Sequence, residues 1–266
     1  MPNLPDGHIL SIENLSINFG GLKAVDDLSF AVRDREIFGL IGPNGAGKTT
    51  VFNCITQFYR PKEGRVYFRA RHGRSLDVVG LPVHQIIRLG LVRTFQNVEI
   101  VRELSLLDNV LIGAHINFKA TIFEQALKLP RARREERAMT EKAVNALETF
   151  GIADRRFMPA GGQPYGVLKK VELARTLMSE PNLIIMDEPA AGLNETETAT
   201  LAGSIRSLRD DHNCAVLLVE HDMRLVMSVC DRICAISFGK FLALGPPSEI
   251  QGNKIVQEAY LGEGDI

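Results

Sequence analysis

The feature that most constrains this chain is a glycine-rich loop that follows a short apolar run. Residues 37–41 read Ile-Phe-Gly-Leu-Ile, which is typical of a strand buried on both faces of a parallel sheet. The G-x-x-x-x-G-K-[ST] spacing of a phosphate-binding loop comes next, in the strand-to-helix setting that gives it meaning. The loop consists of Gly42, Pro43, Asn44, Gly45, Ala46, Gly47, Lys48, Thr49 and Thr50. The chain is therefore expected to bind a nucleoside triphosphate beside a parallel sheet.

The glycines, the lysine and the threonine of this loop each suit the binding of phosphate and Mg²⁺. Glycines let the backbone curl until successive N–H groups point at the β-phosphate, and the following helix adds its positive N-terminal end. Lys48 supplies a positive charge to the β- and γ-phosphates, and the hydroxyl of Thr49 is a ligand for Mg²⁺. A glycine-rich turn without a ligand is the alternative, and the combination of spacing and setting disfavours it.

A second buried strand ends in two carboxylates. Residues 183–188 read Leu-Ile-Ile-Met-Asp-Glu, so an apolar run is followed at once by Asp187 and Glu188. Next to a phosphate-binding loop, Asp187 is expected to hold the Mg²⁺ shell, and Glu188 to orient or deprotonate an attacking water. A solvated acidic pair at a strand end is the alternative.

Other segments indicate two sheets and a helical insertion. Alternation over residues 9–19, closed by Gly20-Gly21, predicts a strand and turn, and residues 28–32 and 65–68 predict further strands of an antiparallel sheet. A third buried run, residues 215–219, joins 37–41 and 183–186 in a parallel core. Between them, one predicted helix has an apolar face and a glycine, Gly151, at its end; the face comprises Met139, Ala143, Ala146, Leu147 and Phe150.

Composition excludes several classes of protein. Lys plus Arg (31) nearly balance Asp plus Glu (32), so charge gives no reason to expect nucleic acid as a partner. No apolar run approaches the roughly 18 residues of a spanning helix, which leaves only a peripheral membrane role. The four cysteines lie in apolar segments and are interpreted as buried free thiols: Cys54, Cys214, Cys230 and Cys234. Basic residues at 131, 133, 134 and 137 alternate with glutamates and are interpreted as a solvated helix start.

An ordered set of motifs resembles one family. Thr94-Phe95-Gln96, Asp187-Glu188-Pro189, Ala191-Gly192-Leu193-Asn194 and Glu220-His221-Asp222 occur in the order found in the ATPase subunit of an ATP-binding cassette (ABC) transporter. The resemblance implies an α/β P-loop NTPase fold with a RecA-like parallel core, an antiparallel β subdomain and an inserted helical subdomain. It implies a single domain over residues 1–266, in which 1–96 and 181–240 form the core and β subdomain, 97–180 the helical subdomain, and 241–266 a C-terminal hairpin and helix.

The same resemblance implies roles for further residues. Gln96 would contact Mg²⁺ and the attacking water and sense a membrane partner, and His221 would contact the γ-phosphate. Phe19 stands where the family stacks an aromatic ring on adenine, with Val25 beside it. ATP and Mg²⁺ are the ligands implied.

In this family two subunits enclose two ATP molecules, and the signature peptide of each subunit closes the site of the other. Two glycine-containing strings compete for this role here, Gly161-Gly162-Gln163 and Pro164-Tyr165-Gly166-Val167. In the common family spacing the last signature residue lies twenty positions before the aspartate and seven before the alanine of a Leu-Ala-Arg triplet. Counting back from Asp187 and from Ala174 gives Val167 both times. The signature is therefore residues 163–167, with Pro164, Tyr165, Gly166 and Val167 as the ATP contacts in trans, and the earlier string leads into it.

The signature also narrows the resemblance. Pro-Tyr-Gly, the Asp-Glu-Pro-Ala-Ala-Gly-Leu-Asn string and the ending Glu-Ala-Tyr-Leu-Gly at residues 258–262 are similar to LivG-type ATPases of importers for branched-chain and hydrophobic amino acids. Such importers imply two transmembrane permease subunits, a second ATPase as a paralogue or an identical copy, a periplasmic or extracellular binding protein, and a place on the cytoplasmic face of the bacterial inner membrane. Importers of urea, amides or aromatic acids, and an ABC-type nucleotide switch outside transport, remain alternatives.

The altered signature has an expected cost. Pro164 lacks the hydroxyl of the usual serine and has no N–H, although its fixed φ suits the first turn of a helix. Losing one charge-assisted hydrogen bond costs about 1.5–3 kcal/mol, or roughly ten- to a hundredfold in rate. The ATP site that this signature completes is therefore expected to be slow.

The resemblance also predicts that the membrane subunits dock over residues 97–115. The apolar residues of this stretch are candidates for either contact or core: Val98, Ile100, Val101, Leu104, Leu106 and Leu107.

Overall fold

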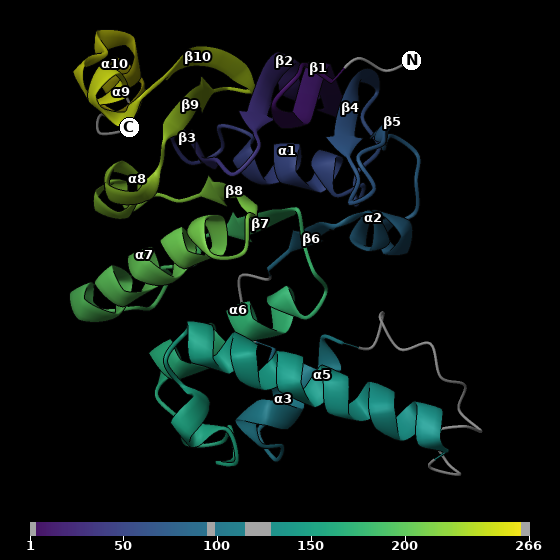
Figure 1. Cartoon of the computed structure of the whole chain (residues 1–266). Helices are drawn as coiled ribbons and strands as arrows, with labels where there is room; N and C mark the ends of the chain where they lie inside the picture. The colour runs from purple at the N-terminus through teal and green to yellow at the C-terminus, as the bar shows by residue number, and fades with distance from the viewer. Residues whose placement is uncertain (1–3, 95–98, 115–128, 262–266) are drawn as a thin grey trace. The chain divides into compact units, whose positions relative to one another are not determined.

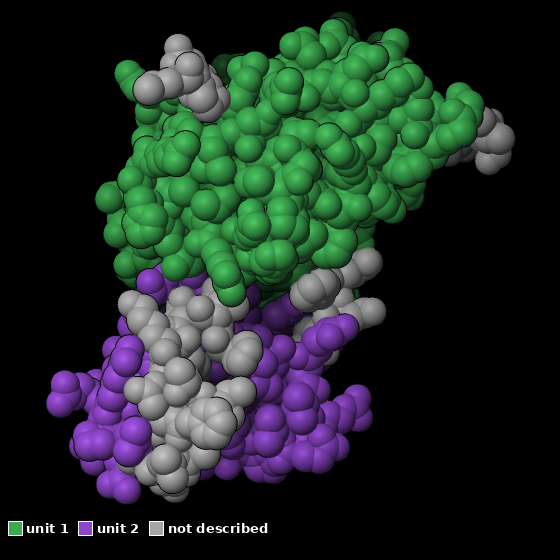
Figure 2. All heavy atoms as spheres, turned by 90° about the vertical axis from the view of Figure 1, so that its right-hand side faces the viewer, with its two compact units in different colours: residues 1–96, 181–266 green, residues 97–180 purple. Residues whose placement is uncertain are grey.

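The computed structural model describes residues 4–94, 99–114 and 129–261. Contacts divide the chain into two compact units, one formed by residues 1–96 with 181–266 and the other by residues 97–180 (Figure 2). The first unit contains both sheets, and the described part of the second is helical.

A six-stranded sheet forms the centre of the first unit. Its order is β10-β9-β3-β8-β7-β6, and the pairs within β9-β3-β8-β7-β6 are parallel. The strands are β3 (Ile37–Ile41), β6 (Leu91–Arg93), β7 (Leu183–Asp187), β8 (Ala215–Val219), β9 (Arg232–Ser237) and β10 (Lys240–Gly245). Every residue of β3, β7 and β8 is buried. The three apolar runs were predicted correctly because a strand covered on both faces has no polar positions.

The second sheet is antiparallel, with the order β2-β1-β4-β5. Its strands are β1 (His8–Phe19), β2 (Leu22–Arg33), β4 (Glu63–Arg69) and β5 (Ser75–Asp77). The predicted strand at 28–32 proves to begin at Leu22, because Gly20 and Gly21 make a tight turn that pairs Phe19 directly with Leu22. The C-terminal hairpin was expected within residues 241–266, but it begins earlier. It pairs β9 with β10 through a turn at Phe238 and Gly239, which both have positive φ, so its first strand ends before residue 241.

One hydrophobic core joins the two sheets. Helix α1 (Lys48–Ile55) lies between them (Figure 1), and its Val51, Phe52 and Ile55 pack with residues of β1, β2, β3 and β8. Helix α2 (Val83–Leu89) adds Ile86 to this core. Helices α7 (Glu195–Asp210) and α8 (Met223–Val229) lie on the other face of the parallel sheet (Figure 1). Helices α9 (Pro247–Gly252) and α10 (Lys254–Leu261) follow β10.

The unit of residues 97–180 contains α3 (Leu106–Ile112), α5 (Pro130–Thr149), a 3₁₀ turn η2 (Ala153–Arg155) and α6 (Tyr165–Leu177). The predicted apolar face of α5 is confirmed, since Ala143, Ala146, Leu147 and Phe150 are buried and Met139 is half-buried. Gly151 follows the helix with φ +64°, as expected of a C-terminal cap. The arginines at its start are exposed.

All four cysteines are buried free thiols, as predicted, and burial raises the pKa of Cys54 to about 12. Among the described residues, no helix has both the length and the apolar composition to cross a bilayer. The predicted fold class is confirmed by the parallel core, the antiparallel sheet and the helical unit.

Candidate nucleotide-binding site

The glycine-rich loop connects β3 to α1. The helix begins at Lys48, and Gly47 before it adopts a left-handed conformation with φ +98°. A Cβ at Gly47 would lie 2.5 Å from the carbonyl oxygen of Ala24, and one at Gly42 would lie 2.2 Å from that of Ile236. Strands β2 and β9 therefore press against the loop from outside, and only residues without a side chain fit these two positions.

Lys48 folds back into the curl of the loop. Its Nζ donates to the carbonyl oxygens of Gly42 at 2.5 Å and Pro43 at 2.8 Å, and the residue is buried. The positive charge thus lies inside the ring of backbone that is expected to surround the phosphates.

The loop opens into a pocket of about 430 Å³. Besides residues 44–50 it is lined by Phe19, Leu22, Lys23, Ala24, Glu188 and Phe238. Phe19 is 45% exposed and meets Tyr59 edge-on, with ring centroids 5.2 Å apart. Val25, predicted to lie beside adenine, is fully buried under Gly47, so its side chain supports the loop and does not line the pocket.

Asp187 ends β7, and Arg93 links its carboxylate to β6 and, through Asn53, to α1. Arg93 of β6 donates from Nη2 to Asp187 Oδ2 at 2.8 Å and from Nη1 to Asn53 Oδ1 of α1 at 2.6 Å. Burial raises the pKa of Asp187, and the neighbouring charges of Arg93 and Lys48 oppose that shift. The carboxylate is thus kept beside the glycine-rich loop by an ion pair that is itself largely buried.

Glu188 and His221 lie at the ends of the neighbouring strands β7 and β8. Glu188 has φ +47°, a costly conformation for a residue with a side chain, and its carboxylate reaches the pocket. Its Oε1 lies 3.8 Å from Nδ1 of His221, whose side chain is 64% exposed. The structure therefore brings these two predicted catalytic residues together.

Gln96 lies outside the described residues, as do Asn97 and Val98 of the predicted docking stretch. Thr49 is exposed and lines the pocket. Within the docking stretch, Leu106 and Leu107 are buried, whereas Val101 and Leu104 are exposed by 43% and 36%. Ile100 is half-buried, so among the described candidates Val101 and Leu104 are the most accessible for contact.

The residues predicted to form the signature lie at the start of helix α6, which begins at Tyr165. Pro164 is the N-cap residue with φ −56° and ψ 147°, one position before the first turn in which it was expected. Gly161 and Gly162 form a turn before it, and the Gly161 N–H donates to Arg102 O at 2.8 Å. Tyr165 and Gly166 present the first N–H groups of the helix, because the first bond back to Pro164 O comes from Val167.

Three residues near the site were missed in the sequence. Phe238 lines the pocket, Arg93 holds Asp187, and Glu220 is a buried carboxylate directly before His221. Arg93 directly precedes the Thr94-Phe95-Gln96 motif, and Glu220 is the first residue of the Glu220-His221-Asp222 motif, in which it was given no role of its own. These positions were the available signal.

Comparisons with known proteins agree with this geometry. A family model described as "ABC transporter" matches residues 25–191, and one described as "Branched-chain amino acid ATP-binding cassette transporter" matches residues 242–266. The chain is 45% identical to the high-affinity branched-chain amino acid transport ATP-binding protein LivG of Salmonella typhimurium, over 96% of this chain and 98% of the relative. It is 43% identical to BraF of Pseudomonas aeruginosa over the same shares.

The fold has a solved counterpart in the ADP conformation of MJ1267, an ATP-binding cassette of an ABC transporter. The TM-score is 0.81 at 31% identity, covering 96% of this chain and 99% of that one. Together with the family match and the near full-length relatives, this shows that the chain belongs to the ABC transporter family as an ATPase subunit of the LivG-like group.

Proposed function

We propose that this chain binds and hydrolyses ATP to energise an importer of branched-chain or other hydrophobic amino acids. The ATPase part is supported by one observation: residues 44–50 of the glycine-rich loop, Lys48 among them, line the same pocket as Glu188. The transport part is supported by the names of the relatives and by the C-terminal family match.

The pocket residues divide the chemistry between them. Lys48 and the loop N–H groups bind the phosphates, Phe19 packs on adenine, and His221 contacts the γ-phosphate. Glu188 accepts the proton of the attacking water, for which its half-buried side chain and its place beside His221 are suited.

Thr49, Asp187 and Gln96 are the proposed ligands of Mg²⁺. The hydroxyl of Thr49 and the carboxylate of Asp187 are hard oxygen donors of the kind that Mg²⁺ prefers, and they flank Lys48, where the phosphates would lie. Bound Mg²⁺ would neutralise charge on the phosphates during transfer.

The signature is proposed to act on the ATP of a second ATPase subunit. Tyr165 and Gly166 offer N–H groups at the positive end of α6, while Pro164 offers neither a hydroxyl nor an N–H. The site that this chain completes in its partner is therefore slower than the site in which a partner with a serine signature completes its own glycine-rich loop. Two permease subunits and an extracytoplasmic binding protein would make up the rest of the importer, with this chain on the cytoplasmic face of the membrane.

Reconstitution of the whole importer in vesicles tests the proposal. Leucine with the binding protein is expected to stimulate ATP hydrolysis and enter the vesicles, and Glu188→Gln is expected to abolish both. Stimulation by urea, amides or aromatic acids but not by leucine would overturn the substrate class. Undiminished hydrolysis by Glu188→Gln would overturn the role of Glu188.

A further inference from the structure

Two loops that carry proposed catalytic groups begin side by side. The carboxylate loop, residues 188–194, follows β7, and the histidine loop, residues 220–222, follows β8. Because β7 and β8 are parallel with Asp187 opposite Val219, both loops leave the sheet at the same edge. Glu188 N also donates to Val219 O at 2.9 Å, so the loops start from a common point.

Glu220 connects the two loops beyond this point. Its Oε1 accepts the Ala190 N–H of the carboxylate loop at 2.7 Å. Its Oε2 accepts the N–H groups of His221 at 2.9 Å and Asp222 at 3.2 Å. The residue is only 1% exposed, so it depends on these three backbone donors and on the His221 ring, whose Nδ1 lies 3.8 Å from Oε2.

A carboxylate is the side chain that suits this position. It has two oxygens and no hydrogen, so it can accept from donors on both sides without presenting a donor to another donor. A glutamine would keep one accepting oxygen and point an NH₂ group at the remaining N–H groups. Buried donors left without an acceptor are costly, so the link between the loops depends on the second oxygen.

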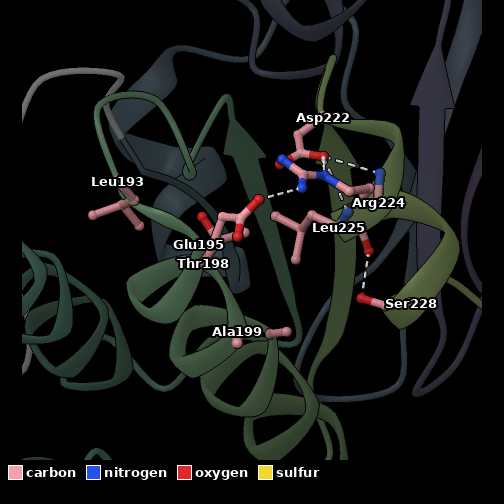
Figure 3. Close-up of a pocket in the computed structure, with 9 residues that line it drawn as sticks. Leu193, Glu195, Thr198, Ala199, Asp222, Arg224, Leu225 and Ser228 are labelled. Carbon is pink, nitrogen blue, oxygen red and sulfur yellow. Dashed lines mark hydrogen bonds and ion pairs between the residues drawn. The ribbon is translucent and has the colours of Figure 1, made fainter.

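An ion pair forms a second link, between the helices that follow the two loops (Figure 3). Arg224 Nη1, in the first turn of α8, donates to Glu195 Oε1, the first residue of α7, at 2.5 Å. The two side chains border a cavity of about 340 Å³ whose lining includes Leu193 and Leu225. They are 76% and 81% exposed, however, and exposed ion pairs contribute little. The buried link through Glu220 therefore contributes more than this ion pair to holding the two loops together.

From these contacts we infer that Glu220 is a positioning residue that fixes the carboxylate loop to the histidine loop, so that Glu188 and His221 keep their relative placement during ATP hydrolysis. It does not line the nucleotide pocket. It acts through the backbone N–H groups of Ala190, His221 and Asp222, and through the ring of His221, whose Nδ1 lies 3.8 Å from Glu220 Oε2. The inference rests on the catalytic roles proposed for Glu188 and His221.

The test is Glu220→Gln in the full chain, assayed with its partner subunits. The kcat for ATP is expected to fall about tenfold or more, because one or more charge-assisted bonds are lost where the loops meet. Affinity for a fluorescent ATP analogue is expected to stay within about twofold, because the glycine-rich loop is untouched. Amide hydrogen exchange is expected to accelerate at both Ala190 and His221, which a purely local defect would not produce.

Glu36→Gln is the matched control. Glu36 is also a buried carboxylate with backbone and guanidinium donors, Arg33 N and Arg232, but it precedes β3 at the strand end away from the glycine-rich loop. It is expected to lower stability while leaving kcat per folded molecule unchanged. Glu195→Ala, which removes the exposed link, is expected to keep kcat within about threefold.

Glu220→Asp keeps the inference testable if the glutamine variant does not fold. It retains the charge but is shorter by one methylene, so it should fold and show an intermediate loss of kcat. If Glu188→Gln abolishes hydrolysis but kcat survives both changes at Glu220, the inference is wrong and the proposed function stands. If Glu188→Gln hydrolyses ATP normally, the catalytic role proposed for Glu188, on which the inference rests, is wrong.

Discussion

Replacing Arg93 by methionine should destabilise the protein through Asp187. The Arg93 side chain is 18% exposed and that of Asp187 is 8%, so the pair is largely buried. Removing one partner of a buried pair typically costs about 3–5 kcal/mol, because it leaves the other charge without compensation. The Asn53 bond is lost as well, while Lys48 still compensates part of the charge of Asp187, so we expect about 3 kcal/mol.

The stability that Arg93→Met loses should depend on pH in a definite direction. Burial already raises the pKa of Asp187, and Arg93 is one of the groups that lower it, so Arg93→Met raises this pKa further. A folded-state pKa above the unfolded value means that the folded protein binds the extra proton, and stability then falls as pH rises between the two values. The difference in free energy of unfolding between the parent and Arg93→Met should therefore be small in acid and reach its full size above the raised pKa of Asp187.

Urea unfolding of four proteins measures this effect: the parent, Arg93→Met, Asp187→Asn and the double variant. Asparagine has nearly the shape of aspartate but no charge, so most of the cost of losing Arg93 should vanish in the Asp187→Asn background. An Arg93→Met loss of equal size in both backgrounds, or a deficit that grows as pH falls, would refute the reasoning.

Three further substitutions follow from the site. Gly47→Ala places a Cβ 2.5 Å from Ala24 O at a positive φ, so binding of a fluorescent ATP analogue should weaken more than about tenfold; retained affinity would contradict the packing argument. Pro164→Ser restores a hydroxyl at the N-cap of α6, and turnover at the site completed by this signature should rise about tenfold; an unchanged rate would show that the hydroxyl is not what limits it. Glu188→Gln here and the equivalent change in a paralogous partner should reduce transport-coupled ATP hydrolysis unequally, and equal losses would contradict the asymmetry of the two sites.

Motifs with a fixed spacing of residue types were predictable from the sequence. Gly42 and Gly47 have to lack side chains because neighbouring strands approach their backbone. Asp187 and Glu188 follow directly on the apolar run of residues 183–186, which is typical of a buried strand. Counting placed the signature at the start of α6, and the preceding Gly161-Gly162 is a turn. Each of these was recognised from residue types at a fixed spacing along the chain, although the strands that pack against Gly42 and Gly47 come from other parts of it.

Predictions about single side chains were less complete. Phe19 and Val25 belong to one strand pair, yet one borders the pocket and the other is buried, because alternation in β2 turns Val25 toward the core. Pro164 suited a helix start by its φ, but whether it would be the cap or the first turn depended on where the backbone of Gly161 and Gly162 had to turn.

The sequence by itself determined the phosphate-binding loop and the buried strands, because the spacing of glycines and apolar residues decides whether a short segment can curl around a phosphate or form a strand. It also determined the order of the motifs, and hence the family. Only the tertiary structure decided which groups hold the side chains proposed for the site. Arg93 reaches Asn53 and Asp187 across 40 and 94 residues of chain, and Glu220 reaches Ala190 across 30. Such contacts follow from strand order in the sheet, and no local pattern of residue types records them.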